Sequence, residues 1–320
     1  MRVLVTGGAG FIGSHFVRHL LANHPDYQVT VLDKLTYAGR MENLQDVHQD
    51  IQFIQGDICN SRDVERAMTG CRLVFNFAAE SHVDRSIDGG GIFVQTNVQG
   101  TYILLEQARR LKMDRYIQVS TDEVYGSSPA RSFVEGDVLN PSSPYSASKA
   151  SADLFTLAQV HTHGLPAVIT RSTNVFGPHQ FPEKLIPVLI LNAIEGLPLP
   201  IYGDGRNVRD WIYVTDNCAA IDFVAHHGRD GEVYNVGGKN ERRNVDVAGL
   251  VLDILERPRE LIQFVPDRPG HDLRYSLDTS KLERLGWHVR TNFEDRLRDT
   301  VAWYRQHEWW WQPLREHGSS

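Results

Sequence analysis

The stretch VTGGAGFIG, residues 5–13, joins a short β-branched run to a segment with helical spacing. Gly7, Gly10 and Gly13 allow a tight turn, a close approach of the backbone to a phosphate, and close packing of helix on strand. The first N–H groups of the helix then face a diphosphate, so the pattern predicts a dinucleotide site that also involves Phe11 and Ile12. A purely structural glycine turn is the alternative.

The second expected strand ends in Asp33, 20 residues past Gly13. A carboxylate here accepts hydrogen bonds from the adenosine ribose and repels a 2′-phosphate, which favours NAD over NADP. Lys34 is a neighbouring positive charge that works against this preference. Asp57 and Ile58 follow the third expected strand and are candidates for the adenine edge.

Outward from this motif, strands alternate with helices as far as residue 177. We expect strands in 2–8, 28–34, 51–58, 72–79, 115–121 and 167–177, and helices in 11–24, 61–68, 96–111 and 145–164. This alternation predicts an α/β fold with a doubly wound parallel (Rossmann) sheet over residues 1–177, because parallel strands need crossover connections. Proline-punctuated segments and later helices indicate a smaller mixed α/β lobe over 178–320, and a segment near 207–236 is expected to return to the first domain.

Composition excludes several classes of function. A net charge of −7 and a pI near 6.0 give no basic surface for nucleic acid or an anionic membrane. The three cysteines are far apart and show no metal-ligand spacing, so we expect no metal site and a cytoplasmic location. No apolar run approaches the roughly 20 residues of a membrane helix, and the strand-like start leaves no room for a signal peptide.

A tyrosine and a lysine lie four residues apart in YSASK, so Tyr145 and Lys149 share one face of a helix. A neighbouring ammonium favours the phenolate, so we expect the pKa of Tyr145 to be lowered. Thr121 ends the fifth expected strand, at the edge where doubly wound sheets bind their ligands. The three residues are candidates for removing a hydroxyl proton; an exposed tyrosine–lysine contact is the alternative.

Two adjacent carboxylates, Asp122 and Glu123, follow Thr121 directly. If both face one pocket, the ionisation of one raises the pKa of the other, so one can keep its proton while the other loses it. Such a pair supplies an acid and a base in one site at neutral pH. The alternative is that one carboxylate only caps the following turn.

These motifs together resemble the extended short-chain dehydrogenase/reductase family, and TDEVYG (121–126) resembles its nucleotide-sugar 4,6-dehydratases in particular. Longer segments at 32–44, 78–87, 174–187, 201–214 and 267–278 are also similar, so the resemblance covers nearly the whole chain. One departure is visible in NVFGP (174–178), where the family usually has N-N-Y-G-P; Val175 and Phe176 replace a polar side chain and a phenol.

The resemblance implies a function and a set of site residues. It implies NAD-dependent dehydration of a nucleoside-diphosphate hexose, dTDP-glucose first among the candidates, by transient oxidation at C4 and loss of water across C5–C6. Thr121, Tyr145 and Lys149 would act at C4, Glu123 as the base at C5, and Asp122 as the acid at C6. The cofactor would further contact Thr36, Ala78, Ala79, Ser81 and Thr96, and the substrate Ser81, Thr121, Asn174, Lys184, Leu185, Tyr202, Arg209, Asn244, Arg268 and His271. A homodimer through the helices at about 97–111 and 146–163 is also implied.

Two other functions remain open at this point. A sugar-nucleotide 4-epimerase or decarboxylase on the same scaffold would share every motif except the need for Asp122 and Glu123. A NAD-binding module without turnover would not need Thr121, Tyr145 and Lys149.

Overall fold

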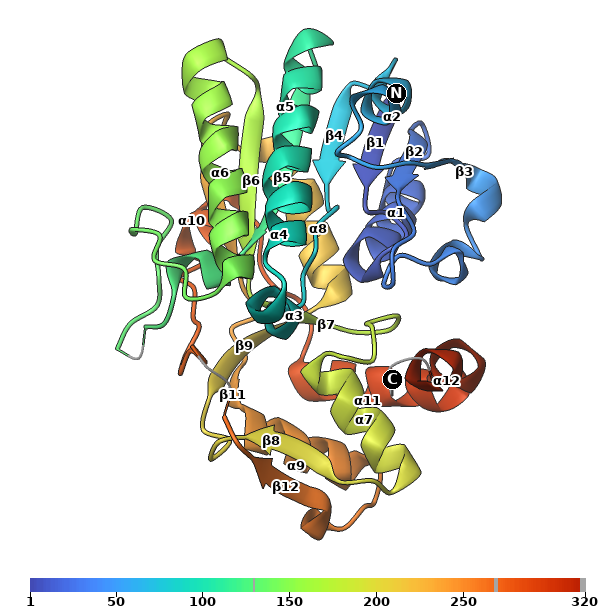
Figure 1. The fold of residues 1–320 in the computed structure, drawn as a ribbon, viewed down its shortest axis with the longest axis vertical. Helices are drawn as coiled ribbons and strands as arrows, with labels where there is room; N and C mark the ends of the chain where they lie inside the picture. Colours follow the sequence, from blue (N-terminus) through green and yellow to red (C-terminus); the bar gives the residue numbers. More distant parts are fainter. Residues whose placement is uncertain (129, 268–269, 317–320) are drawn as a thin grey trace.

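The computed structural model describes residues 1–128, 130–267 and 270–316 (Figure 1). A large sheet flanked by helices occupies one half of the molecule, and a smaller lobe that contains α7, α9, α11 and α12 occupies the other. This arrangement confirms the predicted fold class.

The large sheet has seven parallel strands in the order β10-β6-β5-β4-β1-β2-β3. Its strands are β1 (Arg2–Thr6), β2 (Gln28–Asp33), β3 (Ile51–Gln55), β4 (Leu73–Asn76), β5 (Arg115–Thr121), β6 (Ala167–Ser172) and β10 (Val233–Val236). The strand order reverses between β1 and β4, and the crevice at the carboxyl ends of the strands there is where open α/β sheets bind ligands.

Helices cover both faces of this sheet because successive strand residues point to opposite sides. In β1, Val3 and Val5 pack in one core with α1 (Phe11–Asn23) and α8 (Val214–His227), whereas Leu4 packs in another with α2 (Ser61–Met68) and α5 (Thr101–Arg110). The long helix α6 (Pro144–His163) lies beside α5 on the second face. A parallel sheet covered in this way needs strands that are apolar on both sides, as β1 is.

The smaller lobe has a core of its own. Its strands are β7 (Asn174–Phe176), β8 (Leu199–Tyr202), β9 (Val208–Tyr213), β11 (Glu241–Arg243) and β12 (Ile262–Val265), and its helices are α7 (Leu185–Glu195), α9 (Asn244–Ile254), α11 (Phe293–Gln306) and α12 (Glu308–Glu316). Trp310 and Trp311 of α12 are almost fully buried in this core, and the Trp310 indole N–H donates to Asn43 beyond it. The tryptophan-rich end of the chain therefore docks onto both halves.

Short elements connect these parts. They are η1 (Met41–Leu44), η2 (His48–Asp50), α3 (Val83–Asp88), α4 (Gly91–Phe93), the π-helical η3 (Val94–Gly100), η4 (Asp122–Tyr125), η5 (Arg259–Leu261) and α10 (Ser280–Leu285). In the described part of the chain, no helix combines the length and the hydrophobicity needed to cross a membrane.

The single strand expected over 167–177 is wrong in one respect, because the chain forms two strands there. β6 stays in the large sheet as far as Ser172, and the Thr173 N–H bonds to Val236 O at 2.9 Å. Residues 174–176 then pair with β9 in the three-stranded sheet β11-β9-β7 of the smaller lobe. The break lets the chain pass from the large sheet to the smaller lobe.

Candidate active site

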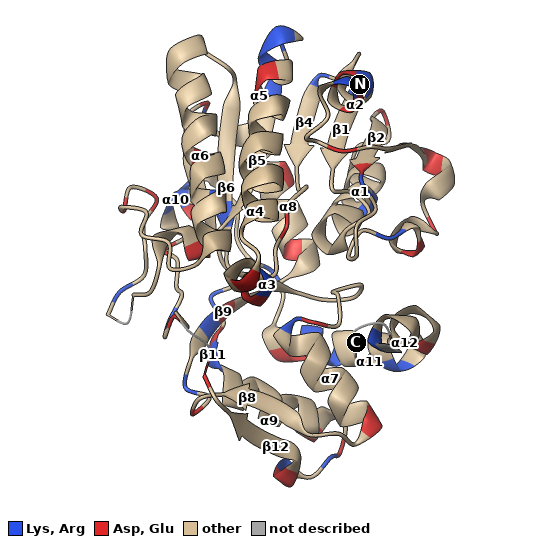
Figure 2. Cartoon of the chain, in the orientation of Figure 1, with Lys and Arg blue, Asp and Glu red and all other residues tan. Residues whose placement is uncertain are grey.

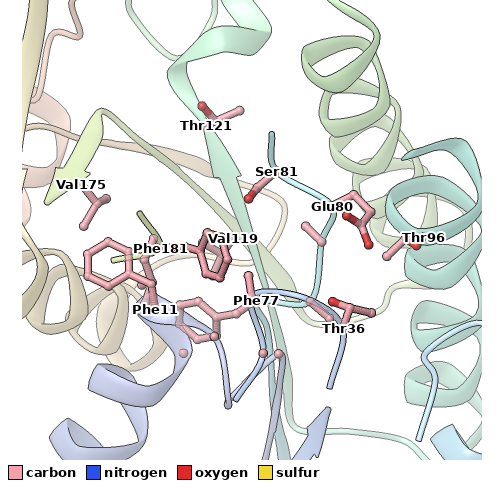
Figure 3. Close-up of a pocket in the computed structure, with 18 of the residues that line it drawn as sticks. Phe11, Thr36, Phe77, Glu80, Ser81, Thr96, Val119, Thr121, Val175 and Phe181 are labelled. Carbon is pink, nitrogen blue, oxygen red and sulfur yellow. The ribbon is translucent and has the colours of Figure 1, made fainter. Parts of the chain in front are cut away.

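A cleft lies over the carboxyl ends of β1, β2, β4 and β5. Its walls include every residue that we predicted to contact the cofactor: Gly7, Gly10, Phe11, Ile12, Gly13, Asp33, Lys34, Thr36, Asp57, Ile58, Ala78, Ala79, Ser81, Thr96, Tyr145 and Lys149. Figure 3 shows Thr36, Glu80 and Thr96 on one side of it and Phe11, Val175 and Phe181 on the other. The carboxyl end of β5, with Thr121, closes its far end.

The glycine turn leaves room that side chains would fill. Gly7 has a φ of +68°, and a Cβ there would lie 2.6 Å from the Ala78 nitrogen. A Cβ on Gly13 would lie 2.2 Å from Gly7 O, so helix α1 could not sit this close to the turn with any other residue. The first turn of α1 thus presents its N–H groups to the cleft without obstruction, which fits a dinucleotide diphosphate.

Asp33 ends β2 with its carboxylate fixed by the backbone. Oδ2 accepts from Ala9 N at 2.9 Å and Oδ1 from Leu35 N at 2.8 Å, while burial raises the pKa of this group. Lys34 turns instead to Asp57, at 2.8 Å, and this hydrogen bond raises the pKa of the lysine. The positive charge that opposed a preference for NAD is therefore paired with Asp57.

Asn97 is a cleft-forming residue that the sequence analysis missed. Its amide accepts from Glu80 N at 2.8 Å and donates to Glu80 O at 2.9 Å and to Ser148 Oγ at 2.8 Å. It lies in the π-helical η3, a conformation that is common at functional sites. Asn97 thereby ties the 78–81 turn to helix α6, which carries Tyr145 and Lys149.

The two adjacent carboxylates follow β5 in the single turn η4. Thr121 caps this turn: its Oγ1 accepts from Glu123 N at 3.3 Å and donates to Asp122 Oδ1 at 3.1 Å. Among the described residues Asp122 Oδ2 is buried without a hydrogen-bond partner. Because Thr121 does the capping, the alternative role of a carboxylate as the cap of this turn is wrong.

Asp122 is the more deeply buried member of the pair. It is 3% exposed, and burial raises its pKa well above the usual range, with further raising by the charge of Glu123. A hydrogen bond from Thr121 and the charge of Arg209 act in the opposite direction. A raised pKa favours the protonated form, in which a carboxyl group can donate a proton.

Tyr145 and Lys149 lie on the buried face of α6, 9% and 6% exposed. The expected lowering of the tyrosine pKa is wrong for this structure: burial and the charges of Glu123 and Asp122 raise it, and a hydrogen bond with Thr121 only partly opposes them. Lys149 donates to Val119 O at 2.7 Å, and burial lowers its own pKa to about 8.

The structure brings together only part of the predicted substrate set. Ser81, Thr121, Asn174 and Lys184 line the cleft, where Lys184 Nζ donates to Ser81 O at 2.7 Å. The others lie in the smaller lobe outside the cleft walls: Leu185 at the start of α7, Tyr202 and Arg209 on β8 and β9, Asn244 at the start of α9, and His271 beside Tyr202. Arg268 falls outside the described residues.

Arg209 is nevertheless within electrostatic reach of the acid pair. Its guanidinium is buried over the Tyr275 ring, at 4.4 Å, and donates to Asp272 O at 3.0 Å. Its charge partly offsets the raising of the pKa of Asp122 by burial, while burial raises the pKa of Tyr275 and the charge of Glu123 adds to that effect. The smaller lobe therefore faces the carboxyl end of β5 at this point.

A second missed feature joins the two sides of the cleft. The Tyr37 hydroxyl, after β2, donates to Glu183 Oε1 at 2.8 Å, and Arg85 Nη2 lies 3.2 Å from the other carboxylate oxygen of Glu183. The Arg85 guanidinium also covers the Tyr37 ring at 3.9 Å. No local signal predicts this bridge, because residues 37 and 183 meet only in the folded chain.

The doubly wound sheet, the glycine turn and the Thr121–Tyr145–Lys149 set define the class as an extended short-chain dehydrogenase/reductase. A model of the family described as GDP-mannose 4,6 dehydratase matches residues 4–300, and the chain belongs to that family.

Individual relatives are similar over nearly the full chain. A dTDP-glucose 4,6-dehydratase of Streptomyces niveus is 48% identical, with 98% of this chain and 96% of the relative covered. The structure of a dTDP-glucose 4,6-dehydratase from Streptomyces venezuelae, with NAD and dTDP bound, superposes with a TM-score of 0.96 at 50% identity over 98% of this chain and 100% of that one. A UDP-glucose 4-epimerase from Thermus thermophilus, in complex with NAD, has a TM-score of 0.90 at 33% identity over 96% of this chain and 100% of that chain.

Proposed function

We propose that the protein is a NAD-dependent hydro-lyase that converts dTDP-glucose to the dTDP-linked 4-keto-6-deoxyhexose. The observation that carries the proposal is the buried carboxyl of Asp122, with its raised pKa, next to Glu123 in one cleft with Thr121 and Tyr145. Loss of water across C5–C6 requires a proton donor and a proton acceptor side by side. The similarity to dTDP-glucose 4,6-dehydratases supports the same reading.

The residues present fit NAD. The turn at Gly7, Gly10 and Gly13 would hold its diphosphate and Asp33 its adenosine ribose, since no side chain fills the turn and the carboxylate ends β2 at the cleft. When bound, NAD accepts a hydride from C4 of the hexose and gives it to C6 after water has left, so the cycle has no net redox change.

Thr121, Tyr145 and Lys149 act at the C4 hydroxyl. Tyr145 accepts its proton and Thr121 hydrogen-bonds the same oxygen. Because burial raises the pKa of Tyr145, the phenol needs a nearby positive charge to ionise. A pKa of about 8 leaves Lys149 mostly protonated at neutral pH, so it can supply that charge.

Glu123 and Asp122 act at C5 and C6. The C4 ketone acidifies the C5 hydrogen, since the carbanion is delocalised as an enolate. Glu123 takes this proton, and Asp122 gives its own proton to the C6 hydroxyl, which leaves as water. Glu123, whose proton exchanges with solvent, then reprotonates C5. Tyr145 releases the proton it gained and Asp122 regains the one it lost, both through solvent.

The smaller lobe contributes the nucleotide-sugar contacts in this proposal. We assign residues 1–177, with the returning segment near 207–236, to the cofactor and residues 178–320 to the substrate. The two phosphates need cations, and Lys184 lines the cleft while Arg209 has its charge near Asp122. Ser81, Asn174, Leu185, Tyr202, Asn244, Arg268 and His271 complete the proposed substrate set.

Incubation of the full chain with dTDP-glucose tests the proposal. The expected product is a 4-keto-6-deoxy sugar, detected by its alkali-induced absorbance and identified by NMR from a methyl group at C6. A product that keeps the C6 hydroxyl and has inverted C4 would instead identify an epimerase. A parallel reaction with UDP-glucose measures the preference of the protein for the thymidine over the uridine nucleotide.

We also propose a cytoplasmic homodimer. The three cysteines are free thiols, which supports a reducing compartment. Helices α5 and α6 and the turn before them expose apolar side chains, Val94, Tyr102, Leu154 and Phe155, at 41–59%. Figure 2 shows few charges along these two helices. A Leu154→Glu change should dissociate the dimer in light scattering; an unchanged mass would contradict this interface.

A further inference from the structure

Three histidines surround one aspartate at the far end of α1, away from the cleft. Asp222 of α8 lies 3.0 Å from His19 Nε2, 3.0 Å from His24 Nε2 and 3.2 Å from His226 Nδ1. His19 belongs to α1 and His24 follows its last residue, whereas Asp222 and His226 share one face of α8. The proposed mechanism uses none of these residues.

We propose that His24, Asp222 and His226 form a binding site for a divalent metal ion of the imidazole-preferring class, such as Zn²⁺. The candidate ligand atoms of the three residues all lie within 4.8 Å of one another. Ligands about 2.0–2.1 Å from a tetrahedral ion are roughly 3.3 Å apart, which matches the observed separations of Asp222 from both histidines. Two imidazoles and one carboxylate leave a fourth position for water.

The carboxylate faces all three imidazoles. Its Oδ2 lies 3.0 Å from both His19 Nε2 and His24 Nε2, and its Oδ1 lies 3.2 Å from His226 Nδ1. His19 is the residue that orients it, because His19 Nε2 bonds to Oδ2 and the Asn23 amide reaches His19 Nδ1 at 3.4 Å. Ligating carboxylates are commonly held by such an outer hydrogen bond.

His226 also has an outer partner. Its Nε2 lies 2.8 Å from the Tyr27 hydroxyl, so with a metal on Nδ1 the Nε2–H group can donate to Tyr27. Nδ1 now contacts Asp222 O at 2.8 Å, so the ring has to turn away from that carbonyl to bind the metal. With 32% of its side chain exposed, His226 is the ligand with room to adjust, and an ion can enter from solvent beside it.

The metal site would join α1 to α8 at a distance from the proposed catalytic residues. His24 follows the 13 residues of α1, so it is about 20 Å from the first turn that faces the cleft. A metal here should stabilise the fold and leave the turnover number unchanged. The sequence gives no sign of the site because His24 and Asp222 are 198 residues apart.

Metal binding to the tag-free full chain after chelator treatment tests this proposal. We expect one equivalent of Zn²⁺ in competition with a chromophoric chelator, no competition by excess Mg²⁺, and an intense four-coordinate absorption spectrum with Co²⁺. Zn²⁺ should also raise the melting temperature. His24→Ala/His226→Ala should lose these signals, and His19→Ala should weaken binding about 10–100-fold.

His227→Ala is the matched control. His227 is the next residue of α8 and makes the same local bond, from Nδ1 to Phe223 O at 2.9 Å, but it is not part of the cluster. It should bind Zn²⁺ as the unaltered chain does. Equal Zn²⁺ affinity in the double variant, or a six-coordinate Co²⁺ spectrum in the unaltered chain, would overturn the proposal. The Co²⁺ spectrum needs no variant, so this result stands even if the double variant fails to fold.

Discussion

The Thr121 hydroxyl donates to Asp122 Oδ1 across 3.1 Å while it accepts from the Glu123 backbone. One side chain thus orients the Asp122 carboxyl, caps the turn that carries Glu123, and contacts Tyr145. In the proposed mechanism, oxidation at C4 and elimination across C5–C6 therefore use groups that meet at the turn after β5. The following predictions test this arrangement and the fold that supports it.

Replacing Asp122 by Asn keeps the size of the side chain and removes its proton. We expect kcat with dTDP-glucose to fall by about 10²–10⁴-fold, the usual contribution of a general acid, with little change in substrate affinity. Stopped-flow absorbance of the nicotinamide should show that oxidation at C4 still occurs. Asp137→Asn, which removes a surface pair with Arg131, is the control and should keep full activity.

Removing the Tyr37 hydroxyl should loosen the cofactor. Tyr37→Phe loses the 2.8 Å bond to Glu183 that joins the two sides of the cleft. A hydrogen bond to a charged group is worth about 1.5–3 kcal/mol, so we expect NAD to dissociate roughly 10–100-fold faster. The rate of exchange of bound cofactor for labelled NAD measures this. Tyr102→Phe is the control, and equal exchange rates in Tyr37→Phe and the unaltered chain would count against the bridge.

The buried amino group of Lys149 should make stability depend on pH in the alkaline range. Its pKa is about 8 in the folded protein against 10.5 in the unfolded chain, so the unfolded state binds more protons between these values and stability rises with pH. This group alone should add about 2 kcal/mol to the free energy of unfolding between pH 8 and pH 10. Urea unfolding of Lys149→Met should lack that increment relative to the unaltered chain; parallel pH curves for the two would contradict it.

Arg171 and Asp153 form a buried ion pair at 2.8 Å, 3% and 0% exposed. Arg171→Met should cost about 3–5 kcal/mol of unfolding free energy, because it leaves the aspartate buried without its partner. Arg72→Ala removes the exposed pair with Asp114 and should cost far less, because solvent screens both charges. Denaturant unfolding of both variants gives the comparison, and similar losses would mean that the buried pair has no special role.

Much of the fold and of the cofactor site follows from local patterns. The glycine turn, the carboxylate 20 residues after it, and the alternation of strands and helices are each readable over short windows of sequence. The break at Thr173 is not, because it depends on which sheet offers residues 174–176 a partner. Likewise Asn97 and Glu183 act through contacts with distant segments.

The electrostatics of the site were also only partly predictable. Adjacent carboxylates in one pocket differ in pKa, but which one has the higher pKa depends on burial, which raises the pKa of Asp122. The pKa of Tyr145 is raised because desolvation and two nearby carboxylates outweigh the effect expected from its helical neighbour, whose amino group bonds to Val119 O. Burial depends on the whole fold, so the sign of this shift could not be derived from spacing.

The most direct test of the account is a single turnover of Glu123→Gln with dTDP-glucose. The account predicts that nicotinamide is reduced and that the sugar accumulates as a 4-ketone which still carries its C6 hydroxyl, with no deuterium entering C5 from D₂O. Formation of the 4-keto-6-deoxy product at a near-normal rate would contradict the assignment of Glu123 as the base, and with it the role of the carboxylate pair.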